Sequence, residues 1–254
     1  MKIFICNWKM APDTLDGARD LFRKSLDIAA SRQDVLTVIC PPLVHLVDCS
    51  HILERQGDTS VRLGAQAIGF GDAPTLTGAC SARMIKNVGA QYVLIGHSER
   101  RYLLHESSDI ISLQIQAAFD EGLIPVVFVG ERERGLGWQD EIIDQLTQSV
   151  SGVSLERLSS IVYVYEPVWA ISSKNKAVDF DEAHIREAGQ YIRDAVAKIT
   201  PAAYLGEIVL LYGGSVNESS IRSLNEISIF SGGVIGGASL SEESLAALYK
   251  NIRS

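Results

Sequence analysis

Short apolar runs alternate with longer segments of helical period along the whole chain, and eight such rounds are present. Most of the short runs are continuously apolar, which is typical of parallel strands buried on both faces. The predicted strands are Lys2–Asn7, Val35–Cys40, Val61–Ala67, Tyr92–Gly96, Ile124–Val129, Ile161–Tyr165, Ile208–Tyr212 and Gly233–Gly236. Apolar residues at helical spacing predict amphipathic helices between and after them. These helices include Thr14–Ala30, Asp109–Glu121, Asp140–Ser151, Asp181–Ile199 and Ser241–Ile252.

The number and length of the rounds indicate the fold. Eight rounds in 254 residues give about 32 residues each, the length of one parallel β-α-β unit, and no Pro-, Gly- or Ser-rich linker divides the chain. We therefore predict an α/β fold in which residues 1–254 form one domain, a closed eight-stranded parallel β/α barrel. An open doubly wound sheet is the alternative. Such a sheet usually has a Gly-rich turn after its first strand, and Cys6-Asn7-Trp8-Lys9 does not resemble one.

Composition and charge exclude several classes of partner. The chain has 46% apolar and 21% charged residues, and 31 acidic against 23 basic side chains give a net charge of −8. Nucleic acids and anionic membranes attract clustered Lys and Arg, and the longest basic run is Arg100-Arg101, so we expect neither partner. The longest apolar run, 122–130, is far shorter than the ~20 residues that span a bilayer.

The chain contains four cysteines: Cys6, Cys40, Cys49 and Cys80. They form no C-x-x-C pair, and most have apolar neighbours, which is typical of a reducing cytoplasm; we expect the protein there, mature from residue 1. His45 and Cys49 are four residues apart with His51 nearby, so they suit two ligands of a metal ion, but a fourth ligand is missing. We expect core and surface roles for them and no metal site.

Reactive groups of a β/α barrel lie at the carboxyl ends of its strands, so polar residues that directly follow the predicted strands are candidates. They are Asn7 and Lys9 after the first strand, His97, Ser98, Glu99 and Arg100 after the fourth, Glu166 after the sixth, Gly213-Gly214-Ser215 after the seventh and Gly236-Gly237 after the eighth. We expect these groups to converge on one mouth of the barrel.

Each of these side chains has a functional and a structural interpretation. Glu166 suits a general base, although a strand-end carboxylate can instead face water or pair with arginine. His97 precedes a predicted helical turn that begins at Ser98, and the amide groups of that turn would favour a neutral imidazole; a structural histidine is the alternative. Lys9 could also be a surface lysine, and Asn7 could simply cap a loop.

The two glycine-rich turns suit the binding of an anion. Glycine lets the backbone approach a phosphate and present several N–H donors, and the loops after strands seven and eight of barrels recurrently bind phosphate. Gly213-Gly214-Ser215 and Gly236-Gly237 occupy that position. Tight turns without a ligand are the alternative.

Six segments carry a family resemblance. They are Asn7-Trp-Lys-Met10, Gly64-Ala-Gln66, Gly96-His-Ser-Glu-Arg-Arg101, Tyr165-Glu-Pro-Val-Trp-Ala-Ile171, Leu211-Tyr-Gly-Gly-Ser-Val216 and Gly236-Gly-Ala-Ser-Leu240. In order and spacing they resemble the triosephosphate isomerase family over the whole chain. The resemblance implies the interconversion of dihydroxyacetone phosphate and glyceraldehyde 3-phosphate through an enediolate, in central carbon metabolism, without a metal or organic cofactor.

The resemblance also implies a role for each motif residue. Glu166 would take the proton from the carbon next to the carbonyl, and neutral His97 would polarise that carbonyl. Lys9 would stabilise the negative enediolate oxygen, with Asn7 as a further donor and Glu99 holding Lys9. The phosphate would be bound by backbone N–H groups of Ser172, Ser215, Gly236 and Gly237. The side chains expected to cover the base are Ile171 and Val234.

Several positions differ from the family pattern. In the family, a Thr-Gly-Glu loop inserts into the partner subunit and contacts an arginine that corresponds to Arg100. The matching residues here are Thr77-Gly78-Ala79, so a carboxylate is missing. Because Thr77 and Arg100 are present, we still expect a homodimer. Further replacements are Phe128 for the usual cysteine, Ala11 for asparagine and Ser231 for aspartate. We interpret these as packing changes near the site.

Two other functions are compatible with the same residues. A paralogous isomerase of another phosphorylated ketose, such as a four-carbon one, would use the same acid and base. In the family a lid loop closes over the phosphate; this loop is altered here, within Ala170–Asn175, and would select substrates by their length. An idle barrel kept for phosphate binding or assembly would need none of the four polar residues Asn7, Lys9, His97 and Glu166, all of which are present.

The lid supplies the first testable prediction. It reads Ala170-Ile-Ser-Ser-Lys-Asn175, where the family has Ala-Ile-Gly-Thr-Gly-Lys. A non-glycine residue held at positive φ costs about 1 to 2 kcal/mol, so we expect a slower or leakier lid. Replacing Ser172 and Lys174 with glycine should raise turnover or reduce phosphate elimination in steady-state assays of both products. No change in either quantity would contradict the prediction.

Overall fold

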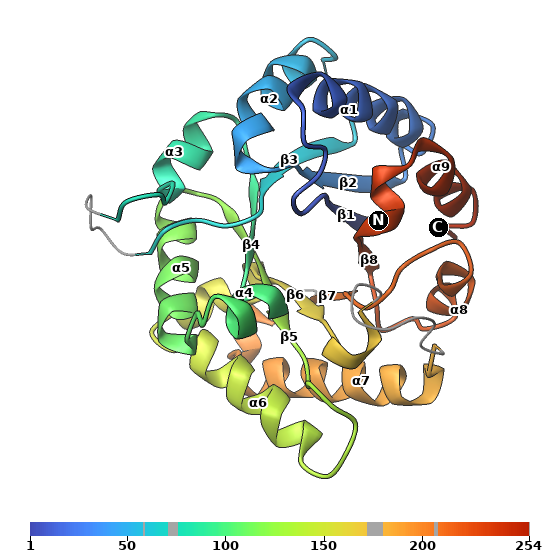
Figure 1. Ribbon diagram of the computed structural model, residues 1–254. Helices are drawn as coiled ribbons and strands as arrows, with labels where there is room; N and C mark the ends of the chain where they lie inside the picture. Colours follow the sequence, from blue (N-terminus) through green and yellow to red (C-terminus); the bar gives the residue numbers. More distant parts are fainter. Residues whose placement is uncertain (58, 71–75, 172–179, 206–207, 254) are drawn as a thin grey trace.

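The computed structural model describes residues 1–57, 59–70, 76–171, 180–205 and 208–253. Eight parallel strands pair in sequence order and close into a barrel (Figure 1). The strands are β1 (Lys2–Asn7), β2 (Val35–Cys40), β3 (Val61–Ala65), β4 (Tyr92–Ile95), β5 (Ile124–Val129), β6 (Val162–Tyr165), β7 (Val209–Tyr212) and β8 (Gly232–Ile235). The predicted closed β/α barrel, a TIM barrel, is therefore confirmed.

Closure depends on the contact between the last strand and the first. Ile3 of β1 pairs with Leu36 of β2 on one side and with Gly232 of β8 on the other. Gly232 has a φ of 153°, and a Cβ atom there would lie 1.8 Å from the carbonyl oxygen of Ile3. Only glycine permits this close approach, so this residue is required where the barrel closes.

Helices form a ring around the barrel (Figure 1). The α-helices are α1 (Leu15–Ala30), α2 (Leu46–Glu54), α3 (Ala82–Asn87), α4 (Ser98–Leu103), α5 (Ser108–Asp120), α6 (Trp138–Ser149), α7 (Glu182–Ile199), α8 (Ser220–Asn225) and α9 (Glu242–Lys250). The 3₁₀ helices are η1 (Leu43–His45), η2 (Leu155–Ser160), η3 (Val168–Ala170), η4 (Ala202–Tyr204) and η5 (Gly237–Leu240). Several α-helices begin at a side chain that accepts a hydrogen bond from their first turn, as Thr14 does from the Gly17 N–H.

The five predicted helices are found with boundaries shifted by at most two residues, and α4 begins at the predicted Ser98. Helices α2, α3 and α8 were not predicted. They have only six to nine residues, and such short segments show too few turns for a helical period to stand out. The predicted strand 233–236 is one residue late, because β8 pairs with β1 from Gly232 onwards.

The strands contribute side chains to two apolar layers, one outside the barrel and one inside it. Side chains that point outward pack under the helices, and side chains that point inward fill the barrel. The inward cluster contains Ile3, Ile5, Leu36, Val38, Cys40, Tyr92, Leu94, Val126, Phe128, Val162, Val164, Leu211 and Val234. The barrel is therefore a packed core, and a site can exist only at its ends.

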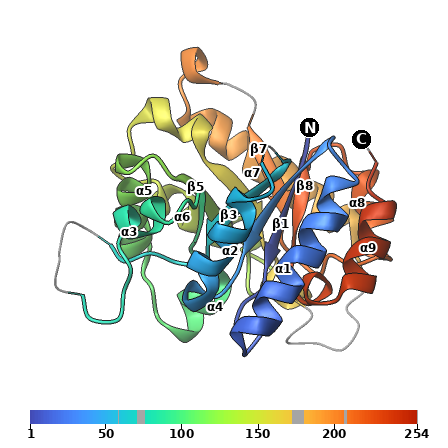
Figure 2. The same ribbon diagram turned by 90° about the horizontal axis from the view of Figure 1, so that it is seen from above.

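The two ends of the barrel differ. The termini lie together at the end opposite α4 (Figure 2). Helix α4 directly follows the carboxyl end of β4, so the carboxyl ends of the strands form the other end.

His45, considered above as a metal ligand, has its Nε2 atom 3.1 Å from the carbonyl oxygen of Pro12. None of the described helices is both long and apolar enough to cross a membrane.

Candidate active site

The carboxyl ends of the strands surround a cavity of about 430 Å³. It is lined by Asn7, Trp8, Lys9, His97, Glu166, Ile171, Gly213, Gly214, Ser215, Val216, Asn217, Val234, Gly236, Gly237, Ala238 and Leu240. The structure thus brings together Asn7, Lys9, His97, Glu166 and the two glycine-rich turns, although up to 230 residues separate them in sequence. Three further candidates after β4 do not line this cavity: Ser98, Glu99 and Arg100. Ser172, predicted to bind phosphate, lies outside the described residues, as does the rest of the altered lid segment 172–175.

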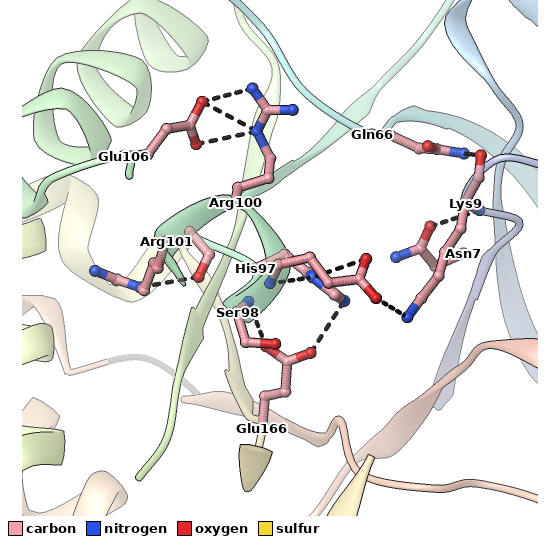
Figure 3. A network of polar contacts seen from close by, with 11 residues as sticks. Asn7, Lys9, Gln66, His97, Ser98, Arg100, Arg101, Glu106 and Glu166 are labelled. Carbon is pink, nitrogen blue, oxygen red and sulfur yellow. Dashed lines mark hydrogen bonds and ion pairs between the residues drawn. The ribbon is translucent and has the colours of Figure 1, made fainter. Parts of the chain in front are cut away.

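Glu166 is held directly after β6 with its carboxylate almost fully buried, at 3% exposure. Its backbone N–H donates to the carbonyl oxygen of Val129, 2.8 Å away, and one carboxylate oxygen accepts from the Ser98 N–H at 2.8 Å. The other oxygen lies 3.0 Å from Nε2 of His97 (Figure 3). A Cβ atom at Gly130 would lie 2.0 Å from the Glu166 carbonyl oxygen, so only glycine leaves room for this strand end.

His97 is the N-terminal cap of α4. Its Nδ1 atom accepts a hydrogen bond from the Glu99 N–H at 3.2 Å. A backbone N–H can only donate, so Nδ1 carries no proton and the ring proton lies on Nε2, which faces Glu166. The side chain presents a neutral N–H donor to the cavity.

Lys9 reaches the cavity from the loop after β1. Its Nζ atom lies 2.6 Å from Oε1 of Glu99. The backbone of Lys9 has a φ of 53°, an unfavourable conformation for a residue other than glycine. Two side chains hold it there: Asn7 accepts from the Lys9 N–H at 3.1 Å, and Gln66 donates to the Lys9 carbonyl oxygen at 2.8 Å (Figure 3).

A partly buried arginine lies near Glu166. Arg101 of α4 donates to the carbonyl oxygens of Gly96 and Phe128 and to the hydroxyl of Ser149. Burial lowers the pKa of Arg101 to about 10, while neighbouring groups that include Glu166 favour its charged form. The charge of Glu166 therefore favours the charged form of Arg101, a coupling that sequence reasoning missed because it follows from tertiary packing.

The two glycine-rich turns differ in their surroundings. A Cβ atom at Gly236 or Gly237 would meet nothing within 4 Å, so this turn is open to the cavity. By contrast, a Cβ atom at Gly213 would lie 2.5 Å from Val164, and one at Gly214 2.2 Å from the Tyr212 hydroxyl. Close packing therefore requires glycine at both positions of the turn after β7. This is the alternative given above, in which the glycines form a tight turn.

The other predicted residues lie around the same cavity. The backbone N–H of Ser215, predicted to bind phosphate, donates to the carbonyl oxygen of Ala170 at 3.2 Å. An anion at this turn would have to compete with that bond. Ile171 and Val234, at 7% and 6% exposure, form apolar cavity wall beside Glu166.

A second buried carboxylate, Glu131, connects β5 with the segment that follows Glu166. Its side chain has no exposed surface, and Oε1 lies 2.8 Å from the Tyr165 hydroxyl, 2.7 Å from Nε1 of Trp169 and 2.9 Å from Nε2 of His184. Burial first, and then the Glu131 charge, hold the pKa of Tyr165 far above its usual range, so the phenol stays protonated and donates. The Val168 N–H also donates to the Glu131 carbonyl oxygen, 3.0 Å away.

Glu131 was missed although a sequence signal existed. It follows the apolar run of β5 after a single glycine, the position at which the other candidates were sought. Its three donors come from β6, η3 and α7, and that convergence is decided by the tertiary fold.

Comparisons with known proteins identify one family. The family model described as Triosephosphate isomerase matches residues 2–252. A protein named Triosephosphate isomerase from Dictyoglomus thermophilum is 34% identical over 253 residues, covering 98% of this chain and 99% of the relative. Relatives with the same name occur in Dictyoglomus turgidum (34% identical over 246 residues, 96% of both chains) and in Chlamydia trachomatis (35% over 252 residues, 97% of this chain and 88% of the relative).

The Glu131 cluster generates a prediction about stability. Glu131→Ala leaves one buried donor (Tyr165) and two partly buried donors (Trp169 and His184) without their acceptor, at a cost of about 1 to 3 kcal/mol for each buried donor left unpaired. The free energy of unfolding, measured by urea titration, should fall by about 3 kcal/mol or more, and Glu131→Gln, which keeps an acceptor oxygen, should lose less. Glu182→Ala is the control, because it removes only an exposed ion pair with Arg186 and should cost about 1 kcal/mol or less. Equal losses for Glu131→Ala and Glu182→Ala would contradict the prediction.

Proposed function

Because this chain belongs to the triosephosphate isomerase family, we propose that Glu166, His97 and Lys9 carry out its chemistry at the cavity described above. The chain is an isomerase that interconverts triose phosphates, so its reaction moves a proton between neighbouring carbons and between their oxygens. The observation that carries the assignment is the arrangement of a buried carboxylate, an N–H of a neutral imidazole and an ammonium group around one cavity.

Glu166 is the general base of this proposal. Its carboxylate lies beside the cavity, and its only described donors are the Ser98 N–H and His97 Nε2. While the Glu166 carboxylate oxygen and the His97 Nε2–H contact each other, neither of these two groups is free to contact a reacting atom of the substrate. A substrate that enters must therefore separate them, so that Glu166 takes a proton from carbon and His97 turns its N–H to an oxygen.

His97 and Lys9 stabilise the oxygen that becomes negative. The Nε2–H group of His97 donates to the carbonyl oxygen, and the fixed Nδ1 bond to the Glu99 N–H keeps this tautomer in place. Lys9 supplies a positive charge whose position is fixed by Glu99 and by the constrained backbone of Lys9 itself. Donors placed in advance where negative charge develops lower the barrier without reorganisation during the reaction.

The phosphate of the substrate is placed at the glycine-rich side of the cavity. The turn of Gly236 and Gly237 is open to the cavity, and its backbone N–H groups suit an anion. We assign the N–H groups of Ser215 and Ser172 to the same phosphate, with Ser215 exchanging its bond to Ala170 for the ligand. Ile171 and Val234 then exclude water from the reacting carbons, and the phosphate contacts position those carbons.

The proposed base is tested with Glu166→Asp. The shorter side chain withdraws the carboxylate by roughly 1 Å, which should lower kcat by about 100-fold with KM nearly unchanged. Steady-state rates should be measured with glyceraldehyde 3-phosphate and with a four-carbon ketose phosphate, for wild type and variant. An undiminished three-carbon rate in the variant would contradict the role of Glu166, and a negligible three-carbon rate in the wild type beside a strong four-carbon rate would contradict the substrate.

We further propose that the protein is a homodimer. Apolar side chains are exposed where the chain leaves β1, β2 and β3: Met10 at 92%, Val44 at 81% and Leu76 at 43% exposure. These strands are neighbours in the barrel, and the described part of the loop around Thr77 projects away from it (Figures 1 and 2). Burial of such a surface against a second copy would stabilise the dimer.

The dimer proposed here relies on apolar contact more than on charge. Arg100 already contacts Glu106 of its own chain, with Nε 3.0 Å from both carboxylate oxygens. Ala79 supplies no carboxylate from the Thr77 loop. An ion pair between subunits is therefore not required to satisfy this arginine.

The dimer is tested by charge insertion. Val44→Glu would bury a carboxylate in the proposed interface and should weaken association about tenfold or more, measured as a loss of dimer mass by light scattering across a dilution series. Leu136→Glu is the matched control, because Leu136 is also fully exposed and lies in the loop between β5 and α6. A wild type that is monomeric at all concentrations, or equal effects of both substitutions, would overturn the proposal.

The proposed site also bears on domain organisation and location in the cell. Its residues come from β1 to η5, so we treat residues 1–254 as one functional domain. The four cysteines are free, and three of them are buried. This supports the proposal that the protein acts in the cytoplasm, where thiols stay reduced.

A further inference from the structure

The ring of Phe128 contacts the imidazole of His97. It is on β5, inside the barrel, with 1% of its surface exposed. The centroids of the two rings are 5.1 Å apart and their planes are inclined by 61°, the edge-to-face arrangement that aromatic pairs prefer. His97 itself is buried, at 7% exposure.

The other contacts of the imidazole do not fix it throughout the reaction. Nδ1 accepts from the Glu99 N–H, and Nε2 faces Glu166. In the proposed reaction the second contact is given up when substrate separates His97 from Glu166. One hydrogen bond then remains, and rotation about the bond to the ring has a broad energy minimum. The contact with Phe128 involves neither nitrogen and can therefore persist when Nε2 turns to the substrate.

Phe128 is itself rigidly placed. It pairs with Val164 in the parallel ladder between β5 and β6, and its carbonyl oxygen accepts from Nη2 of Arg101 at 3.2 Å. Its ring fills the barrel among inward-pointing side chains. A side chain held by a central strand and by close packing can hold a neighbouring group more accurately than a loop residue can.

We propose that Phe128 is a positioning residue that sets the orientation of the His97 ring, so that Nε2 points at the substrate oxygen. The inference rests on the role proposed for His97. Phe128 does not line the cavity and touches no reacting atom, so it acts only through the imidazole.

The test compares Phe128→Leu with a matched control in the full-length protein. Leucine keeps an apolar side chain but removes the ring face, so kcat should fall about tenfold while KM stays within about twofold. Phe4→Leu is the control, since Phe4 is equally buried, at 1% exposure, but packs outside the barrel against Tyr249. Its kcat should match the wild type. A kcat of Phe128→Leu within about twofold of Phe4→Leu would overturn the proposal.

Nuclear magnetic resonance provides a readout that a merely structural role would not change. The ¹⁵N shifts of His97 report which ring nitrogen carries the proton. The Nδ1 bond to the Glu99 N–H should keep the proton on Nε2 in both proteins, but the His97 ring resonances of Phe128→Leu should be broadened by motion of the imidazole. Ring resonances as sharp as in wild type, together with an unchanged kcat, would contradict the proposed positioning.

A double-mutant cycle separates this inference from the proposed function. If Phe128 acts through His97, Phe128→Leu should change kcat by less than about twofold in a His97→Gln background. An equal loss in both backgrounds would show that Phe128 acts through the fold alone and would overturn the inference. If His97→Gln by itself keeps the wild-type kcat, the assignment of His97 fails and the inference fails with it; loss in His97→Gln without loss in Phe128→Leu refutes only the inference.

Discussion

The pairing of β8 with β1 is the constraint on which the site depends. It closes the sheet, and closure brings the loop after β1 next to the turn after β8, opposite the ends of β4 and β6. Without it, Lys9 and the open turn at Gly236 would lie at opposite edges of an open sheet. Glu166 and His97 would lie far from them in its interior. The glycine at position 232, where any side chain would strike the β1 backbone, is therefore as necessary to the chemistry as the residues of the cavity.

The charged groups at and near the site are held by backbone N–H groups and by buried side chains more than by surface ion pairs. The Glu166 carboxylate accepts from a backbone N–H at the start of α4, and the same helix orients His97 and carries Arg101. Glu131 accepts from three side chains without any exposure to water. Such buried groups hold their positions because leaving any of them without a partner costs more than the net gain from each bond. The net charge of −8 therefore says little about the local field at the cavity.

The fold was predictable because most strands coincide with a continuous apolar run and each long helix has apolar residues at helical spacing. The errors fall where that signal is short. Helices α2, α3 and α8 have too few turns, and the start of β8 is set by its register with β1. The positions of Glu166 and His97 were predictable because the carboxyl ends of all strands of a barrel lie at one end of it. Their prediction required no information about side-chain contacts. Glu131 occupied an equivalent position and was missed, since nothing in its neighbours indicates that its carboxylate is fully buried.

The sequence by itself determined the order of elements, the barrel class, the family and the side chains available at the mouth, because these follow from periodicity and from motifs that are local in the chain. Only the tertiary structure decided which atoms face one another. It placed Nδ1 of His97 at the Glu99 N–H, the Phe128 ring edge-to-face with that imidazole and Arg101 close enough to Glu166 for their charges to interact. It also showed that close packing requires the glycines after β7, whereas the turn after β8 is open. These outcomes depend on distances between segments far apart in sequence, which no local pattern encodes.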